Sequence, residues 1–277
     1  MVPGGIQMLR KLMKYEFRAT SRTFLPLYGV LLLVAFLLAV FDQMHESWGE
    51  SIPWLDTASM ITSFVYGGLF IAIMVMTALV TFQRFYHNLF TDEGYLTHTL
   101  PVKPHTHVTG KLLVSIVWIV ASIAVFLLSL LILSIFHLQP VDAKEFFTAL
   151  AQWIPKSNLE GWIIFLELLL FLFLGLVCSI LSIYMAIAVG NISSRHKAAL
   201  GIGVFVGTGI IQQVVYSLGI TLGIRSTWDL WKNVPDNTFP TWPIHGFLLG
   251  HIAYLLLFSA LFYMVISWVL KKKLNLS

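Results

Sequence analysis

Six long runs of apolar residues constrain the fold of this 277-residue chain more than any other feature of its sequence. Each run has about 18 residues or more, the length that an α-helix needs to cross a hydrocarbon core roughly 30 Å thick. With 58% hydrophobic and only 11% charged residues, the chain cannot cover a soluble globule with polar surface. The runs are also too long and too uniform for barrel strands. The sequence therefore predicts an all-α integral membrane protein with six transmembrane helices, at Phe24–Phe41, Met60–Phe82, Leu112–His137, Trp162–Val189, Leu200–Ile224 and Phe247–Leu270.

The basic residues are distributed unevenly between the two sides of these runs. Thirteen of the 17 Lys and Arg residues would lie on one side of the membrane, before the first run or in the connections after the second, fourth and sixth runs. Only four would lie on the other side. Because Lys and Arg near spans stay in the cytoplasm, both termini are predicted to be cytoplasmic. The acids are concentrated on the outer side, so the net charge of +4 reflects topology and predicts no nucleic-acid partner. Seven Trp residues fall near the outer boundary, as in an interfacial belt: Trp48, Trp54, Trp153, Trp162, Trp228, Trp231 and Trp242.

The segment at residues 8–22 is predicted to be an amphipathic helix that lies on the membrane and contacts lipid. Its apolar arc consists of Leu9, Leu12, Met13 and Phe17, and its basic arc of Arg10, Lys11, Lys14, Arg18 and Arg22. Glu16 falls on the apolar arc, where a carboxylate gains nothing from lipid. Two interpretations stay open for Glu16: snorkelling or an ion pair with a neighbouring base, or contact with a protein docked beneath the membrane.

A polar segment interleaved with aromatic residues, RFYHNLFTDEGYLTHTLPVKPHTH, joins the second and third runs. Its first part continues the preceding helix with an apolar stripe of Phe85, Tyr86, Leu89 and Phe90. A turn at Asp92, Glu93 and Gly94 is followed by a second small apolar face of Tyr95, Leu96 and Leu100, which ends at Pro101. Such a helix can insert into a groove of another protein, although a loop lying passively on the bilayer is the alternative.

Three blocks of this sequence, RFYHNLFTDEGYLTHTLPV, the TGKLL that follows it, and the N-terminal MLRKLMKYEFRAT, resemble permease subunits of bacterial ATP-binding-cassette (ABC) transporters of the second exporter type. The resemblance implies a type V exporter-like fold in the bacterial plasma membrane, with an interfacial helix, six spans and a cytoplasmic coupling element at residues 84–104. The residues it implies for contact with the ATPase are Asp92, Glu93, Gly94, Tyr95, Leu96 and Leu100. Phe85, Leu89 and Glu16 are further candidates for this coupling surface.

The chain contains no G-x-x-x-x-G-K-[ST] motif, so no cradle of backbone amides for a nucleotide phosphate is expected. The resemblance implies that ATP and Mg are bound by two copies of a separate ATPase subunit, and that a second permease chain, the same or paralogous, completes the path. No cofactor and no metal are expected on this chain, because the His105-x-His107 pair has no Cys companion. No serine-hydrolase or metalloprotease motif is present either, so an enzyme acting alone is not expected.

Polar residues inside the apolar runs are informative because each costs free energy in hydrocarbon. Glu167 in the fourth run is interpreted either as a residue that binds a cationic substrate or relays a proton, or as one that snorkels or hydrogen-bonds to a neighbouring helix. In the fifth run, Gln212, Gln213 and Tyr216 share a helix face, and the run also contains a Gly203-x-x-x-Gly207 motif. These residues either pack within the subunit or line the substrate path or dimer interface, as the resemblance implies. The outer segment at residues 225–246 is predicted to be re-entrant or interfacial.

The function expected from these features is export of a hydrophobic or amphipathic substrate, such as a peptide antibiotic, a drug or a lipid-like molecule, by a permease subunit that uses a separate ATPase. Two alternatives stay open. One is the membrane-embedded substrate-binding subunit of an energy-coupling importer. The other is an immunity or scaffold protein that transports nothing.

Overall fold

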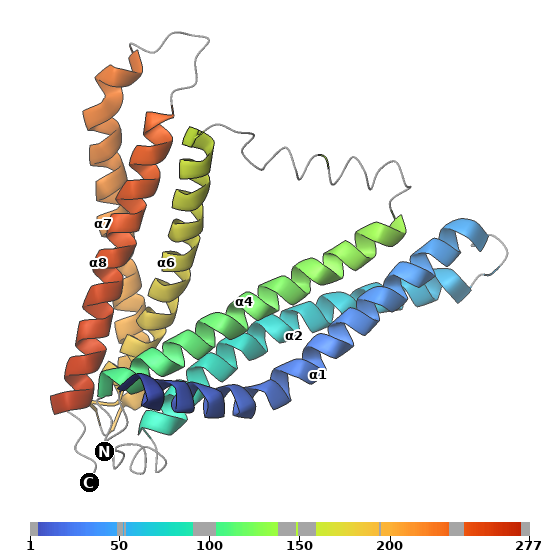
Figure 1. Cartoon of the computed structure of the whole chain (residues 1–277), viewed down its shortest axis with the longest axis horizontal. Helices are drawn as coiled ribbons and strands as arrows, with labels where there is room; N and C mark the ends of the chain where they lie inside the picture. The colour runs from blue at the N-terminus through green and yellow to red at the C-terminus, as the bar shows by residue number, and fades with distance from the viewer. Residues whose placement is uncertain are drawn as a thin grey trace. The chain divides into compact units, whose positions relative to one another are not determined.

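The computed structural model describes residues 5–48, 52, 54–90, 104–137, 148, 159–193, 195–232 and 241–272. Throughout this part of the chain the regular secondary structure is α-helical (Figure 1). The helices are α1 (Gly5–Trp48), α2 (Trp54–Phe90), α4 (Pro104–His137), α6 (Leu159–Gly190), α7 (Lys197–Lys232) and α8 (Trp242–Lys272). Each of these six contains a stretch that is long and apolar enough to cross a membrane. The predicted all-α fold and the six spans are confirmed, and the chain is a multi-pass membrane protein.

All six helices extend beyond the predicted spans, because the polar residues at their ends continue the helix. The α4 helix begins at Pro104, and Pro suits a first helical position because the missing N–H has no partner there in any case. The α7 helix runs through residues 225–232 without interruption, and α8 begins at Trp242. Much of the outer segment at 225–246 is therefore continuous with its two flanking helices. Its predicted re-entrant or interfacial character rests also on residues 233–240, which lie outside the described ranges.

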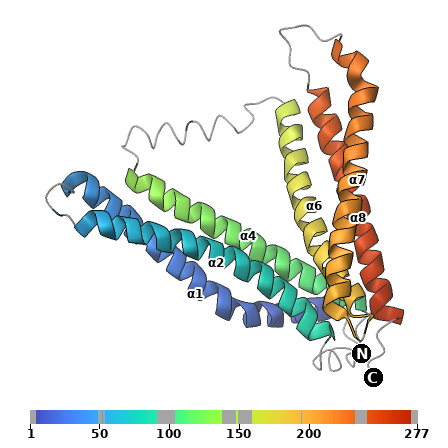
Figure 2. The ribbon, with the colours of Figure 1, turned by 180° about the vertical axis from the view of Figure 1, so that it is seen from behind.

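The α1 helix combines the predicted interfacial helix and the first span into one helix of 44 residues. No break separates residues 22 and 24, but Figures 1 and 2 show a clear bend after the dark blue N-terminal part. Pro26 lies inside this helix and cannot donate to the carbonyl one turn earlier, which bends a helix without ending it. At about 1.5 Å per residue, α1 is about 66 Å long, so a large part of it extends beyond the hydrocarbon core. The position of residues 8–22 on the membrane surface stays a prediction.

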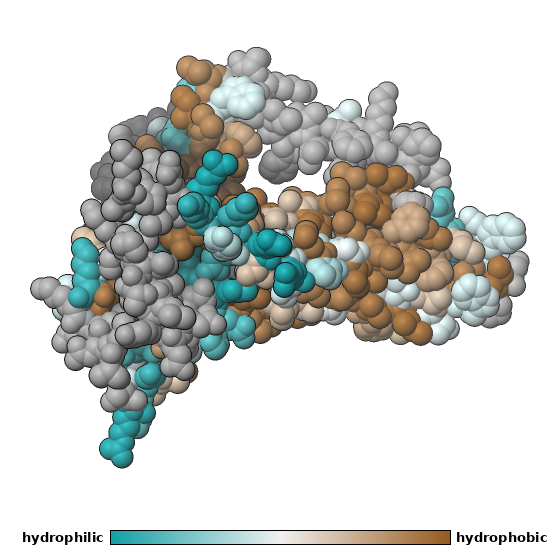
Figure 3. Space-filling model, turned by 60° about the horizontal axis from the view of Figure 1, so that its bottom comes forward, coloured by the Kyte–Doolittle hydropathy of each residue, from teal (hydrophilic) through white to brown (hydrophobic). Residues whose placement is uncertain are grey.

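The chain divides into two compact units. The first unit comprises Met1–His87 and Thr109–Ile154, and contains α1 and most of α2 and α4. The second unit comprises Asn88–Val108 and Pro155–Ser277, and contains α6, α7 and α8. In the space-filling view of Figure 3, hydrophobic side chains cover most of the visible flank of the first unit's helices. Many of these side chains are large and exposed, such as Leu33 and Phe64, as expected for residues that face lipid.

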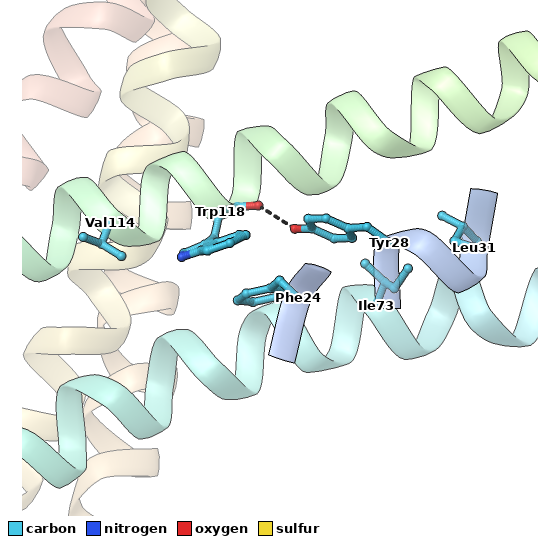
Figure 4. Close-up of a cluster of buried hydrophobic side chains, with 6 residues drawn as sticks. All are labelled: Phe24, Tyr28, Leu31, Ile73, Val114 and Trp118. Atoms are coloured by element: carbon cyan, nitrogen blue, oxygen red, sulfur yellow. Dashed lines mark hydrogen bonds between the residues drawn. The ribbon is translucent and has the colours of Figure 1, made fainter. Parts of the chain in front are cut away.

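An aromatic cluster holds the three helices of the first unit together (Figure 4). Phe24 and Tyr28 of α1 lie against Trp118 of α4, and the rings of Phe24 and Trp118 stack with their centroids 4.6 Å apart. Ile73 of α2 belongs to the same buried cluster. Because lipid tails are as apolar as these side chains, close van der Waals packing between the helices, more than exclusion of water, stabilises the unit.

Hydrogen bonds between side chains accompany this packing. The Trp118 indole Nε1–H donates to Thr20 Oγ1 at 2.7 Å, which joins α4 to α1. The Tyr28 hydroxyl and Ser122 Oγ lie 2.7 Å apart, and the Thr77 hydroxyl of α2 lies 3.0 Å from the same Ser122 oxygen. One serine on α4 therefore connects all three helices. Two further bonds between helices join Tyr66 to Ser129 and Ser59 to Asp42.

The second unit is built around α6, which packs against both α7 and α8. Where α6 meets the start of α7, the backbones approach closely: a Cβ atom added to Gly190 would lie 2.8 Å from the Lys197 carbonyl oxygen and 3.0 Å from Gly201 Cα. Only glycine fits at such a contact without a shift of backbone. The rest of α7 is largely uncovered, and none of its most apolar membrane-length window is buried.

Candidate functional site

An ionic cluster joins the three helices of the first unit. The Lys111 ammonium of α4 donates to Glu16 Oε1 of α1 at 2.6 Å and to the Arg84 carbonyl oxygen of α2 at 3.0 Å. The Arg84 guanidinium Nη1 lies 3.9 Å from Glu16 Oε2. The side chains of Lys111 and Glu16 are only 7% and 15% exposed. This is a tight, largely desolvated ion pair with an additional base beside it, so removing either partner would leave the other without its closest counter-charge.

Each member of the ionic cluster comes from a different one of the three sequence blocks that carry the family resemblance. Glu16 lies in MLRKLMKYEFRAT, Arg84 begins RFYHNLFTDEGYLTHTLPV, and Lys111 lies in TGKLL. Arg84 is also the first residue of the predicted coupling element, and Lys111 follows the element in sequence. Of the two interpretations of Glu16, the structure shows the ion pair with a neighbouring base.

The predicted coupling residues are only partly covered by the structure. Phe85 and Leu89 lie on the last turns of α2, and both side chains are fully buried. The chain itself therefore covers these two residues, which the sequence places among the possible contacts with a partner. The remaining candidates lie outside the described residues: Asp92, Glu93, Gly94, Tyr95, Leu96 and Leu100.

The second unit contains an open cavity of about 520 Å³ between α6, α7 and α8, near the middle of these helices. We call it the intramembrane groove. Gln212, Gln213 and Tyr216 of α7 line it, so the polar face predicted for the fifth run borders a cavity. Its other lining residues are Phe171, Gly175, Cys178, Ser179, Ser182 and Ile183 of α6, Phe205 and Gly209 of α7, and His251, Tyr254 and Leu255 of α8.

Hydrogen bonding along the groove is incomplete. The hydroxyls of Ser179 and Ser182 donate to carbonyl oxygens of their own helix, at 2.8 Å in both cases. The Gln212 side chain bonds to Cys178 Sγ at 3.5 Å and to Tyr254, whereas the Gln213 amide has only a long contact of 3.5 Å to Ser217 Oγ. Within the described residues, the carboxamide oxygen of Gln213 has no hydrogen-bond partner. This amide is a polar group in an apolar environment with unused hydrogen-bonding capacity.

Aromatic rings surround His251 at one side of the groove. Its imidazole lies 4.5 Å from the Tyr216 ring and 5.2 Å from the Phe171 ring, measured between ring centroids. The Phe247 ring is 4.8 Å away. The Tyr254 hydroxyl donates to the Gln212 carbonyl oxygen at 3.0 Å, which fixes α8 to α7 at this level. The rings hold the imidazole in place by edge and face contacts.

The other intramembrane candidates have different surroundings. Glu167 of α6 does not line the groove; its two carboxylate oxygens lie 3.0 and 2.9 Å from Nδ1 of His245 on α8. This contact agrees with the interpretation of Glu167 as a residue that bonds a neighbouring helix. A Cβ atom on Gly203 or Gly207 would meet nothing within 4 Å, so neither glycine takes part in close packing within the chain. The tight glycine contact is instead the one at Gly190 and Gly201.

The residues of α6 and α8 that line the groove were not predicted from the sequence. Phe171, Gly175, Cys178 and Ser182 recur at helical spacing along α6, and that periodicity was a usable signal. His251 and Tyr254 follow no pattern that separates them from the apolar residues around them. Cys178 is buried and also borders the groove.

Comparisons with known protein families, with curated proteins and with solved structures find no match to this chain. In the part of the chain that the structure describes, no three His, Cys, Asp or Glu side chains are placed to hold a metal ion together.

Proposed function

We propose that this chain is the transmembrane permease subunit of an ATP-driven exporter in the bacterial plasma membrane, and that it moves a hydrophobic or amphipathic substrate out of the cell. Two copies of a separate ATPase subunit bind ATP and Mg and supply the energy. A second permease chain, identical or paralogous, completes the path. Under this proposal both termini and the coupling element at residues 84–104 are cytoplasmic.

The ionic cluster of Glu16, Arg84 and Lys111 is the observation that carries this proposal. Of the sequence blocks that resemble ABC permeases, the N-terminal one is far in the chain from the other two, yet its Glu16 pairs with Lys111 and lies 3.9 Å from Arg84. If the resemblance of these three short segments were due to chance, there would be no reason for residues from all three to lie in one cluster.

The cluster also suggests how force would reach the helices. Arg84 is the first residue of the coupling element and Lys111 follows it on α4, and Glu16 pairs with Lys111 and lies 3.9 Å from Arg84. A partner that displaces the element would therefore pull on α1, α2 and α4 together instead of bending a loop. Rigid movement of packed helices is how domain closure is transmitted in many transporters and switches.

The test is recovery of an ATPase partner by the full-length chain. The tagged chain is crosslinked in its native membrane and purified, and polypeptides with a G-x-x-x-x-G-K-[ST] motif are identified by mass spectrometry. Recovery of an ABC ATPase by the wild-type chain is expected. The pair Glu93→Arg and Leu96→Asp should abolish its recovery, since it alters the predicted contact surface.

The matched control is Glu46→Arg, which reverses an exposed carboxylate near the other end of α1 and should leave ATPase recovery unchanged. Equal recovery by the double variant would contradict the predicted coupling surface. A chain that never recovers an ATPase and leaves efflux unchanged when deleted fits the immunity or scaffold alternative. Tight binding of a nutrient, with uptake in place of efflux, fits the energy-coupling importer.

A further inference from the structure

The intramembrane groove has a chemical character that restricts what can occupy it. None of its lining residues is Asp, Glu, Lys or Arg; the polar groups are amides, hydroxyls, a thiol and an imidazole. The carboxylate nearest along α6, Glu167, is outside the lining and bound to His245. A permanently charged ligand would lose its hydration here without gaining a counter-charge. The aromatic faces attract a cation, but this compensates only partly for a lost hydration shell.

The hydrogen-bonding groups of the groove are of both kinds. The Gln213 carboxamide offers an oxygen acceptor that no described residue uses, and its amide nitrogen retains a donor beyond its single long contact. The Tyr216 hydroxyl also has no hydrogen-bond partner among the described residues. A ligand that both donates and accepts hydrogen bonds would satisfy these groups, whereas a pure hydrocarbon would leave them unpaired in the membrane.

The volume of the groove and its apolar lining further restrict the ligand. A volume of about 520 Å³ lies within the range of pockets that bind drug-sized ligands. Four aromatic rings border it, from Phe171, Phe205, Tyr216 and Tyr254. Rings on all three helices provide flat faces for an aromatic or branched apolar body.

We infer that the intramembrane groove binds an uncharged amphipathic molecule with an apolar body and neutral groups that both donate and accept hydrogen bonds, the chemistry of a capped hydrophobic peptide. Its role as a substrate site rests on the proposed transport function, but binding itself needs no ATPase. The proposed ligand binding and the proposed transport function can therefore be contradicted independently of each other.

Two glycines allow the groove to be closed without disturbing the helices. A Cβ atom on Gly175 or Gly209 would meet nothing within 4 Å, so a larger side chain would extend into the open cavity. Replacing a helical glycine also improves helix propensity. Gly219 of α7 has equally open space over its Cα but does not line the groove, so Gly219→Leu is a matched control.

The probe is the tripeptide Leu-Trp-Leu with a photoreactive diazirine in its first side chain, made in three forms. One form is capped at both ends, one has a free amine and one has a free carboxylate. The full-length chain in phosphatidylcholine nanodiscs is irradiated with each form, and the labelled residues are identified by mass spectrometry. Size-exclusion chromatography checks that each variant is folded.

The capped peptide should label residues of the groove lining, and both charged forms should label them roughly tenfold less. Gly209→Leu and Gly175→Leu should each abolish this labelling, whereas Gly219→Leu should leave it at the wild-type level. Equal labelling by all three forms, or labelling that survives both blocking variants, would overturn the inference. It would also be overturned if the capped peptide did not label the lining at all, as expected if a second copy of the chain covers the groove.

Discussion

The two units use their polar side chains inside the membrane differently. In the first unit, Tyr28, Ser122 and Thr77 bond to one another across three helices. In the second unit, Gln212 and Gln213 border a groove, and the Gln213 amide has only one long contact. Since an unpaired polar group is costly in hydrocarbon, the difference separates polar groups that hold helices together from polar groups available to a ligand. We therefore interpret the first unit as a scaffold and the second as the location of binding.

The largest effect on stability is expected from Trp118→Ala in the first unit. This change removes the ring that stacks on Phe24 and the hydrogen bond to Thr20, and should lower the free energy of unfolding by about 4 kcal/mol. Thermal unfolding of the purified chain in detergent measures the loss. Trp268→Ala, at a residue of the second unit that is 47% exposed, should cost only about 1 kcal/mol. Similar losses of stability in Trp118→Ala and Trp268→Ala would contradict the proposed distinction between the two units.

Next in size is Lys111→Met, which leaves Glu16 charged and buried without its ammonium partner. The expected destabilisation is about 3 kcal/mol, again measured by thermal unfolding. Lys11→Met, at an exposed lysine of the same α1 helix, is the control and should have little effect. If the exchange of Glu16→Lys with Lys111→Glu recovers part of the loss, the pairing itself is responsible. A loss of equal size in the control would argue against a specific ion pair.

A smaller effect should distinguish two glycines within the second unit. Gly190→Ala places a methyl group 2.8 Å from a backbone oxygen at the start of α7 and should destabilise the unit by about 2 kcal/mol. Gly209→Ala faces the groove, where a methyl group meets nothing, so no loss is expected. Unfolding temperatures of the two variants in the same detergent test this contrast. A comparable loss for Gly209→Ala would mean that the groove is filled by protein.

The smallest effect compares two tyrosine hydroxyls. Tyr28→Phe removes the bonds to Ser122 and to the Trp118 carbonyl and should cost about 0.6 kcal/mol, typical of a hydrogen bond between membrane helices. Tyr216→Phe removes a hydroxyl that no described residue binds and should leave the unfolding temperature unchanged. It should nevertheless weaken labelling of the groove by the capped tripeptide. A stability loss at Tyr216 equal to that at Tyr28 would contradict the proposed division of roles.

Sequence reasoning predicted the groove only in part. The face of Gln212, Gln213 and Tyr216 was recognisable because polar residues at helical spacing stand out in an apolar run. The sequence of one helix could not show whether these residues pack against another helix or line a substrate path, because that depends on which residues of other helices face them. The structure places α6 and α8 around a cavity there. Gly203 and Gly207 carry a motif typical of close packing, yet none of the described residues lies within 4 Å of a Cβ atom placed on either, and the close contact uses Gly190 and Gly201.

The boundary at the N-terminal helix illustrates a second limit. A change from amphipathic to uniformly apolar residues near Arg22 predicted two helices, one on the membrane and one through it. Hydrogen bonding along the backbone continues across that change, and Pro26 bends the helix without ending it. Hydropathy reports the surroundings of a segment, whereas helix ends depend on local backbone geometry.

The sequence by itself determined that this chain is helical and spans a membrane six times, because the length and hydropathy of each run are local properties and the backbone must satisfy its own hydrogen bonds in lipid. Only the tertiary structure decided that Glu16 pairs with Lys111, that Glu167 pairs with His245, and that three helix faces enclose the groove. These outcomes depend on which faces of distant segments meet. Hydropathy is nearly uniform around such helices, so it does not specify those faces.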